Sequence, residues 1–251
     1  MKRVVTALFL IPIAVYSVMF APWWAFFGVV AILAILSFHE YAVITQSFAP
    51  LGYVAGILIL FAPGHETMLL ILLSTLAAMC LTLTAAEPGR GFTRAAALVL
   101  GIIYIFGAWK AGILLHDMNP NWLMFALGVN WIGDTGAYYV GKNFGRHKLA
   151  PAVSPGKSWE GAVASLVFGI AFGIVYLPLT IKGVSLAEAG LIALAANIAG
   201  QAGDLAESAI KRGSGVKDSG TLLPGHGGFL DRLDSTLFAM PVVYTLLTIV
   251  M

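Results

Sequence analysis

Long apolar segments alternate with short polar ones along the 251 residues of this chain. We interpret nine of the apolar segments as spans, because an α-helix needs about 20 residues to cross a bilayer. They cover residues 4–20, 23–45, 51–62, 66–85, 93–115, 121–142, 159–180, 186–212 and 230–250. Their uniform apolarity argues against a transmembrane β-barrel, whose strands alternate with a period of two. The pattern predicts an all-α fold, a polytopic transmembrane helical bundle of about nine spans.

Composition agrees with a membrane-embedded chain. Hydrophobic residues make up 59% of the sequence and charged residues only 10%, with a mean hydropathy of +0.91. The single cysteine, Cys80, excludes an intramolecular disulfide. With no long polar segment to form a soluble unit, we expect one integral membrane domain over residues 1–251. Residues 1–120 would supply N-terminal helices, and residues 121–251 would carry the candidate site.

Basic residues predict the orientation, because cytoplasmic loops carry an excess of Lys and Arg. With nine spans and a cytoplasmic N-terminus, twelve of the fourteen basic residues face the cytoplasm. Merging the short third span with the fourth would place Lys2 and Arg3 on the other side. The first apolar run lacks an A-x-A-like cleavage site at the right place, so we expect it to be retained. The sequence thus predicts a multi-pass protein of a bacterial inner membrane with its site facing the cytoplasm.

Acidic residues gather in or at the ends of the predicted spans. An ionised carboxylate inside a bilayer is costly unless it is paired, solvated or bound to a metal. Seven of the twelve acids lie there: Glu40, Asp134, Glu160, Asp204, Glu207, Asp231 and Asp234. This concentration predicts a polar cavity. For Glu40, a functional role and a structural bond to His39 or to a distant basic group stay equally open.

Two spans place their acids on defined faces. Asp204, Ser208 and Lys211 are spaced i, i+4, i+7 and share a helix face, and Glu207 can pair with Lys211 at i+4. On the last span, Asp231 and Asp234 share a face at i, i+3. Such carboxylates suit Mg²⁺, which takes one or two of them together with substrate phosphates. The alternative is a set of intramembrane salt bridges.

The loop between these spans reads GSGVKDSGTLLPGHGG and is rich in glycine. Glycines let backbone amides approach an anion closely. Gly227 and Gly228 precede a predicted helix N-terminus, where free amides and the helix dipole favour phosphate. His226 could touch a phosphate or a leaving group. Together with Lys211, Arg212 and Lys217, the loop predicts a site for a metal ion and a polyphosphate.

A second polar cluster follows the sixth span. It contains Asp134, Lys142, Arg146, His147, Lys148, Ser154, Lys157 and Glu160. The functional interpretation is a phosphate clamp at the membrane surface. Alternatively, Glu160 is a first-turn capping acid and Lys157 only a topology signal, with Ser158 as the helix cap.

The segment SAIKRGSGVKDSGTLLPGHGGFLDRLDS, Ser208–Ser235, resembles the signature of phosphatidate cytidylyltransferases, also called CDP-diacylglycerol synthases. That signature reads S-x-x-K-R, four residues, K-D, and then H-G-G-x-x-D-R-x-D. The matching residues are Ser208, Lys211, Arg212, Lys217, Asp218, His226, Gly227, Gly228, Asp231, Arg232 and Asp234. GDLAES and SPGKSWEG also look like the family, and the helix around Glu40 does so more loosely. The likeness is good from Asp134 to Ser235 and rests mainly on topology before that.

The resemblance implies a Mg²⁺-dependent enzyme, with one or two ions, that converts CTP and phosphatidate into CDP-diacylglycerol and pyrophosphate. The implied catalytic residues are Asp204, Asp231, Lys211, Lys217, Asp218 and His226. The implied substrate-binding residues are Ser154, Lys157, Ser208, Arg212, Gly227, Gly228, Arg232, Asp134 and Glu160. The implied metal ligands are Asp204, Asp231 and Asp234. The expected partners are CTP, phosphatidic acid and the lipid bilayer, without nucleic acid, and a homodimer is compatible with the sequence.

Three other functions compete with this reading. A CTP-dependent lipid kinase of the dolichol-kinase type would need similar loops but would release CDP. A CDP-alcohol phosphotransferase is disfavoured because its D-x-x-D-G-x-x-A-R hallmark is absent from the sequence. An ion-coupled transporter could also carry intramembrane acids, but it would not need the glycine–histidine loop.

Overall fold

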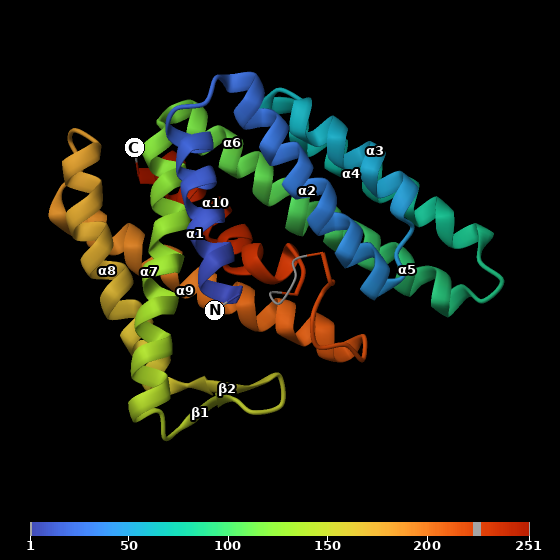
Figure 1. Ribbon diagram of the computed structural model, residues 1–251. Coiled ribbons are helices and arrows are strands. Elements are labelled where there is room, and N and C mark those ends of the chain that lie inside the picture. Colours follow the sequence, from blue (N-terminus) through green and yellow to red (C-terminus); the bar gives the residue numbers. More distant parts are fainter. Residues whose placement is uncertain (1, 223–226, 251) are drawn as a thin grey trace.

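The structure is a computed structural model that describes residues 2–222 and 227–250. Most of these residues are helical, as predicted (Figure 1). The helices are α1 (Lys2–Met19), α2 (Trp23–Thr45), α3 (Ala49–Phe61), α4 (Thr67–Leu81), α5 (Pro88–Gly101), α6 (Ala108–Met118), α7 (Pro120–Phe144), α8 (Trp159–Thr180), α9 (Leu186–Gly213) and α10 (Leu230–Val250). Two short 3₁₀ turns, Gly64–Glu66 and Thr82–Thr84, flank α4.

Four helical stretches in the described part of the chain are long and apolar enough to cross a membrane. They are Trp23–Thr45, Gly64–Thr84, Pro88–Met118 and Trp159–Thr180. The stretch Pro88–Met118 joins α5 to α6 through a π-helical segment, Ile102–Gly107. The chain is therefore a mostly helical protein with four candidate membrane-spanning segments among its described residues, while the number nine and the orientation stay predictions.

One element departs from the all-α prediction. β1 (Lys148–Ala150) and β2 (Ser154–Ser158) form an antiparallel hairpin between α7 and α8, with Lys148 opposite Ser158. The five residues of β2, SPGKS, show neither a long apolar run nor a strand-like alternation, so the sequence pattern does not predict this strand. The hairpin ends at Ser158, whose hydroxyl accepts the Gly161 amide at 3.2 Å and caps α8. The predicted role of Ser158 as a cap is confirmed.

The C-terminal helices pack closely and set the geometry of the site. Figure 1 shows α7 and α8 at one edge, α3 and α4 at the other, and α9 and α10 between them. Where α9 meets α10, a Cβ atom on Gly203 would lie only 2.6 Å from the Asp234 carbonyl oxygen. Glycine at this position lets the two backbones touch. The contact brings the next residue along α9, Asp204, towards the first turns of α10.

Candidate active site

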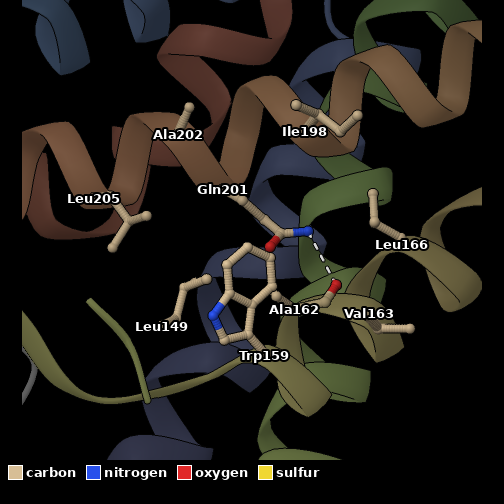
Figure 2. Close-up of a pocket in the computed structure, with 9 residues that line it drawn as sticks. All are labelled: Leu149, Trp159, Ala162, Val163, Leu166, Ile198, Gln201, Ala202 and Leu205. Carbon is tan, nitrogen blue, oxygen red and sulfur yellow. Dashed lines mark hydrogen bonds between the residues drawn. The ribbon is translucent and has the colours of Figure 1, made fainter. Parts of the chain in front are cut away.

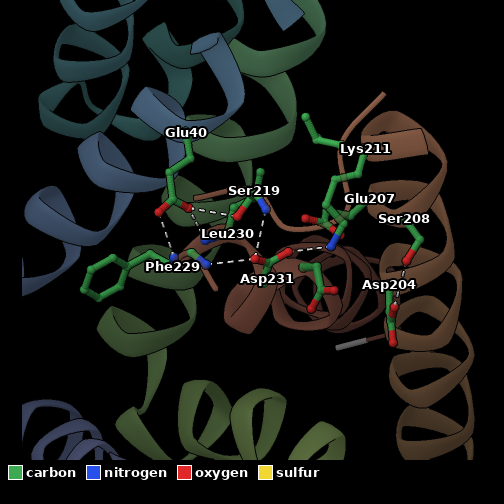
Figure 3. Close-up of polar contacts among 12 residues, drawn as sticks. Glu40, Asp204, Glu207, Ser208, Lys211, Ser219, Phe229, Leu230 and Asp231 are labelled. Atoms are coloured by element: carbon green, nitrogen blue, oxygen red, sulfur yellow. Dashed lines mark hydrogen bonds and ion pairs between the residues drawn. The ribbon is translucent and has the colours of Figure 1, made fainter. Parts of the chain in front are cut away.

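Lys211 in the last turn of α9 is the centre of a buried ionic cluster (Figure 3). Its Nζ lies 2.5 Å from Glu207 Oε2 and also contacts Asp231 Oδ1 at the start of α10. The side chains are 10%, 1% and 8% exposed respectively, so all three charges are largely withdrawn from solvent. The predicted pairing of Glu207 with Lys211 is confirmed. Lys211 in addition joins α9 to α10, which the spacing along one helix could not show.

Asp231 organises the loop as well as binding Lys211. Its Oδ2 accepts the Ser219 amide at 3.0 Å and the Gly228 amide at 2.8 Å. Gly227 adopts φ +78°, and a Cβ atom there would come within 2.5 Å of the same oxygen. Both oxygens of Asp231 are therefore engaged, one by a cation and the other by amides from the middle and the end of the glycine-rich loop.

Glu40 reaches the same loop from α2. Its Oε1 accepts the Phe229 amide at 3.1 Å, and its Oε2 accepts the Leu230 amide at 2.9 Å and the Ser219 hydroxyl at 3.0 Å. The neighbouring His39 instead pairs with the Tyr53 hydroxyl at 2.9 Å. Consecutive residues on a helix point about 100° apart, which separates the two side chains. The predicted bond from Glu40 to His39 is therefore wrong. The described partners of Glu40 are the Phe229 and Leu230 amides and the Ser219 hydroxyl.

The amides at the N-terminus of α10 are already bonded. The Gly228 amide donates to Asp231, and the Phe229 and Leu230 amides donate to Glu40. A phosphate at this helix end would have to displace a carboxylate. The anion site expected at Gly227 and Gly228 stays a prediction. The present hydrogen bonds do not favour it, because carboxylates already accept the amides of Gly228, Phe229 and Leu230.

An ion pair joins the second polar cluster to the first. Lys157 Nζ on β2 lies 2.5 Å from Asp204 Oδ2 on α9, and both side chains keep more than a quarter of their surface exposed. Ser208 lies one turn further along α9, with its hydroxyl 3.5 Å from Asp204 Oδ1. Lys157 thus stands in the site beside an acid, which a topology signal alone would not explain.

Asp234 on α10 belongs to the same acidic region. This buried side chain lies within electrostatic range of Asp134, Asp204 and Glu207. Among the residues with defined positions, no three His, Cys, Asp or Glu side chains are grouped so as to hold a metal ion. The acidic region therefore contains the oxygen ligands that Mg²⁺ prefers, without a complete protein cage.

Other predicted residues lie around this centre. Glu160 accepts the Arg146 amide at 3.1 Å and pairs with His147 Nδ1 at 2.7 Å, so it secures the start of the hairpin. The Arg212 guanidinium donates to the Val216 carbonyl at 3.0 Å. Lys217 and Asp218 are exposed on the loop, Arg232 is exposed on α10, and Ser154 is half-buried on β2. His226 lies outside the described residues.

An apolar groove lies between α8 and α9 (Figure 2). Its volume is about 270 Å³. The hydrophobic lining comes from Leu149, Trp159, Val163, Leu166, Ile198 and Leu205. Gln201 and Ala162 also line the groove, and the Gln201 side-chain amide donates to the Ala162 carbonyl at 3.2 Å. The groove and the Lys157–Asp204 pair draw on the same part of the chain, since Leu205 follows Asp204 along α9 and Trp159 lies two residues after Lys157.

Two contacts of the site were not predicted from the sequence. The contact of Glu40 with the loop joins residues nearly 200 positions apart, and the sequence signals were an acid within an apolar span and a loose resemblance of its helix to the family. The Lys157–Asp204 pair joins the hairpin, which the sequence did not predict, to α9, which it did.

Known proteins of one name are similar to this chain in sequence. The Pseudomonas aeruginosa phosphatidate cytidylyltransferase is 38% identical over 264 residues, which cover 98% of this chain and 96% of the relative. The Staphylococcus aureus enzyme of the same name is 34% identical over 198 residues, 76% of each chain. The Bacillus subtilis enzyme is 39% identical over 155 residues, 61% of this chain and 58% of the relative.

Residues 1–250 also match the profile of one protein family, which leaves almost nothing of the chain outside the match. The match includes α2 with Glu40 as well as the C-terminal helices. The chain therefore belongs to the Cytidylyltransferase family.

Proposed function

We propose that this protein is a phosphatidate cytidylyltransferase that transfers CMP from CTP to phosphatidate and releases pyrophosphate. The observation that carries the proposal is the convergence of Lys211, Asp231 and the Lys157–Asp204 pair at the end of α9 that also contributes to the apolar groove. The charged groups suit a nucleotide and a lipid phosphate. The groove and the membrane-spanning helices suit the hydrocarbon part of a lipid substrate.

In the proposed reaction a phosphatidate oxygen attacks the α-phosphorus of CTP. A new phosphorus–oxygen bond forms, the bond from the α-phosphorus to the bridging oxygen breaks, and pyrophosphate leaves with that electron pair. The nucleophile is already anionic, so the protein needs little general base. Its task is to position the two phosphates and to stabilise the charge that develops.

The side chains divide this task by charge. We propose that Lys157, Lys211, Arg212 and Lys217 bind phosphate oxygens. Lys157 and Lys211 now hold carboxylates, so a phosphate would replace Asp204 or Asp231 as their partner. Hydrogen-bonding and shape roles are proposed for Ser154, Ser208, Gly227, Gly228, Arg232, Asp134 and Glu160. Asp218 and His226 are proposed to complete the loop side of the site.

Mg²⁺ fits the acidic region by donor chemistry. Asp204 and Asp234 supply carboxylates of the required type, and an incomplete protein cage is compatible with an ion that also takes waters and substrate phosphates. Asp231 could join them once Lys211 turns to a phosphate. When bound, the ion would neutralise charge on the two anionic substrates.

The proposed setting is a bacterial inner membrane. We propose nine spans with a cytoplasmic N-terminus, one integral domain, and a site that faces the cytoplasm. Supporting contacts join the ends predicted to be cytoplasmic: Arg94 Nε near the start of α5 donates to the Gln46 carbonyl after α2 at 2.8 Å. Lys157 before α8 likewise meets Asp204 near the end of α9.

Cysteine labelling would test this orientation. In a Cys80→Ser background, Ala152→Cys in the hairpin should react with an impermeant maleimide only when the cytoplasmic side is open. Lys182→Cys, after α8, should react in intact spheroplasts. The reverse pattern would contradict the cytoplasmic N-terminus.

The reaction is tested by its products. Purified protein in detergent, given CTP, phosphatidate and Mg²⁺, should form CDP-diacylglycerol and pyrophosphate in equal amounts, and chelation of the ion should stop both. CDP together with a phosphorylated lipid would instead identify a kinase. No nucleotide turnover with any phosphatidate would reject the proposal and favour a transporter.

A further inference from the structure

Glu40 is a buried acid on α2 that carries no role in the reaction proposed above. It lies far from the signature in sequence, yet it bonds the segment that bears Asp231. We propose that Glu40 is a positioning residue that holds the N-terminus of α10, and with it Asp231, in place. The kinetic part of this inference rests on the proposed function, whereas its structural part does not.

The contact uses the whole carboxylate. One oxygen accepts the Phe229 amide, and the other accepts the Leu230 amide and the Ser219 hydroxyl, all within 3.1 Å. The residue is only 3% exposed. A buried carboxylate without such partners would be strongly destabilising. These three donors are therefore what allows an acid to remain at this depth.

The loop is shaped around that carboxylate. A Cβ atom on Gly220 would lie 2.5 Å from Glu40 Oε1, and one on Gly228 would collide with Glu40 Oε2. Two glycines of the loop are thus required by the approach of Glu40. The fit fixes residues 220 and 228 closely against α2.

Two carboxylates divide the amides at the start of α10. Asp231 takes the Gly228 amide with Oδ2, and Glu40 takes the next two amides. This division leaves Asp231 Oδ1 for Lys211. Without Glu40, the unbonded amides at the positive end of the helix would attract Asp231, the carboxylate already bonded beside them. Glu40 therefore keeps Asp231 available to the site.

Substitution by glutamine tests the inference at constant size. One carboxylate oxygen becomes an NH₂ group that opposes a backbone N–H, so at least one of the three bonds is lost. Hydrogen exchange followed by mass spectrometry should show amides 228–230 of Glu40→Gln exchanging about tenfold faster, the factor expected for one lost hydrogen bond. Peptides from α7 and α8 should exchange as in the wild type.

Glu188→Gln is the matched control. Glu188 also caps a helix, because it accepts the Ser185 amide at 2.8 Å at the other end of α9. This variant should lower the unfolding temperature slightly and leave exchange at 228–230 unchanged. It separates the general loss of a capping acid from loss of this particular contact.

A kinetic series separates positioning from stability. At a temperature well below unfolding, kcat per folded molecule should fall about 10-fold to 100-fold in Glu40→Gln, since displacement by about 1 Å can cost that much. Ser219→Ala removes one of the three bonds, so its kcat should lie between that of the wild type and that of Glu40→Gln. Across the series kcat should follow exchange at 228–230 and not the unfolding temperature.

Two results would overturn the inference: wild-type exchange at 228–230 in Glu40→Gln, or an unchanged kcat per folded molecule. If Glu40→Gln does not fold, Ser219→Ala carries the same test with the same two readouts. A wild-type protein without cytidylyl transfer would reject the proposed function, and exchange alone would then decide whether Glu40 holds the loop.

Discussion

Lys211→Met is expected to lower the free energy of unfolding by about 3–5 kcal/mol, the usual cost of removing one partner from a buried ion pair. The variant leaves Glu207 and Asp231 without their shared cation in a region that excludes solvent. It should also remove cytidylyl transfer, because Asp231 loses the partner that orients it. Thermal unfolding in detergent and product formation measure the two effects separately.

Arg90→Met is the control for loss of an ion pair. Arg90 pairs with Glu87 at 2.9 Å, but the two side chains are 81% and 63% exposed. Exposed pairs contribute about 0–1 kcal/mol, so this variant should melt almost as the wild type does. In a Lys211→Met background, Glu207→Gln should recover part of the stability and none of the activity. An unchanged melting temperature in Lys211→Met would show that the cluster is solvated.

Asp231→Asn is expected to reduce product formation by about 1,000-fold or more, in the range found for residues that act directly in catalysis. Both oxygens of Asp231 accept hydrogen bonds, one from Lys211 and the other from the Ser219 and Gly228 amides. An asparagine must turn its NH₂ group towards one of these donors. The loop and the lysine therefore cannot both keep their present positions.

The comparison for this variant is Asp117→Asn. Asp117 lies at the end of α6, half-exposed, with a contact of 3.9 Å to His116. That variant should form CDP-diacylglycerol and pyrophosphate at the wild-type rate. If Asp231→Asn folds and retains more than a tenth of the activity, Asp231 is not part of the reaction centre.

The helices were predictable because long apolar runs and short charged loops are local signals. The bounds expected for the second, seventh and last helices agree with α2, α8 and α10 to within one residue. The pairing of Glu207 with Lys211 was predictable for the same reason, since i, i+4 spacing fixes it on one helix.

The rest depends on contacts between distant segments. The bond from Glu40 to Leu230 and the ion pair of Lys157 with Asp204 require knowing which helix ends meet. The sequence predicted an open anion site at the glycine loop because it shows that backbone amides are present there. It does not show which groups accept their hydrogen bonds. Only the packing of α2 against α10 reveals that two carboxylates already occupy them.

The bonds of Glu40 bear on whether the two halves of the chain are autonomous. A fragment that began at residue 121 would retain the whole signature and both helices of the ionic cluster. It would nevertheless lack the acceptor of the Phe229 and Leu230 amides, and so lose about 0.5–1.5 kcal/mol for each of these hydrogen bonds. The N-terminal helices therefore contribute directly to the candidate site, because Glu40 on α2 bonds the two residues that precede Asp231.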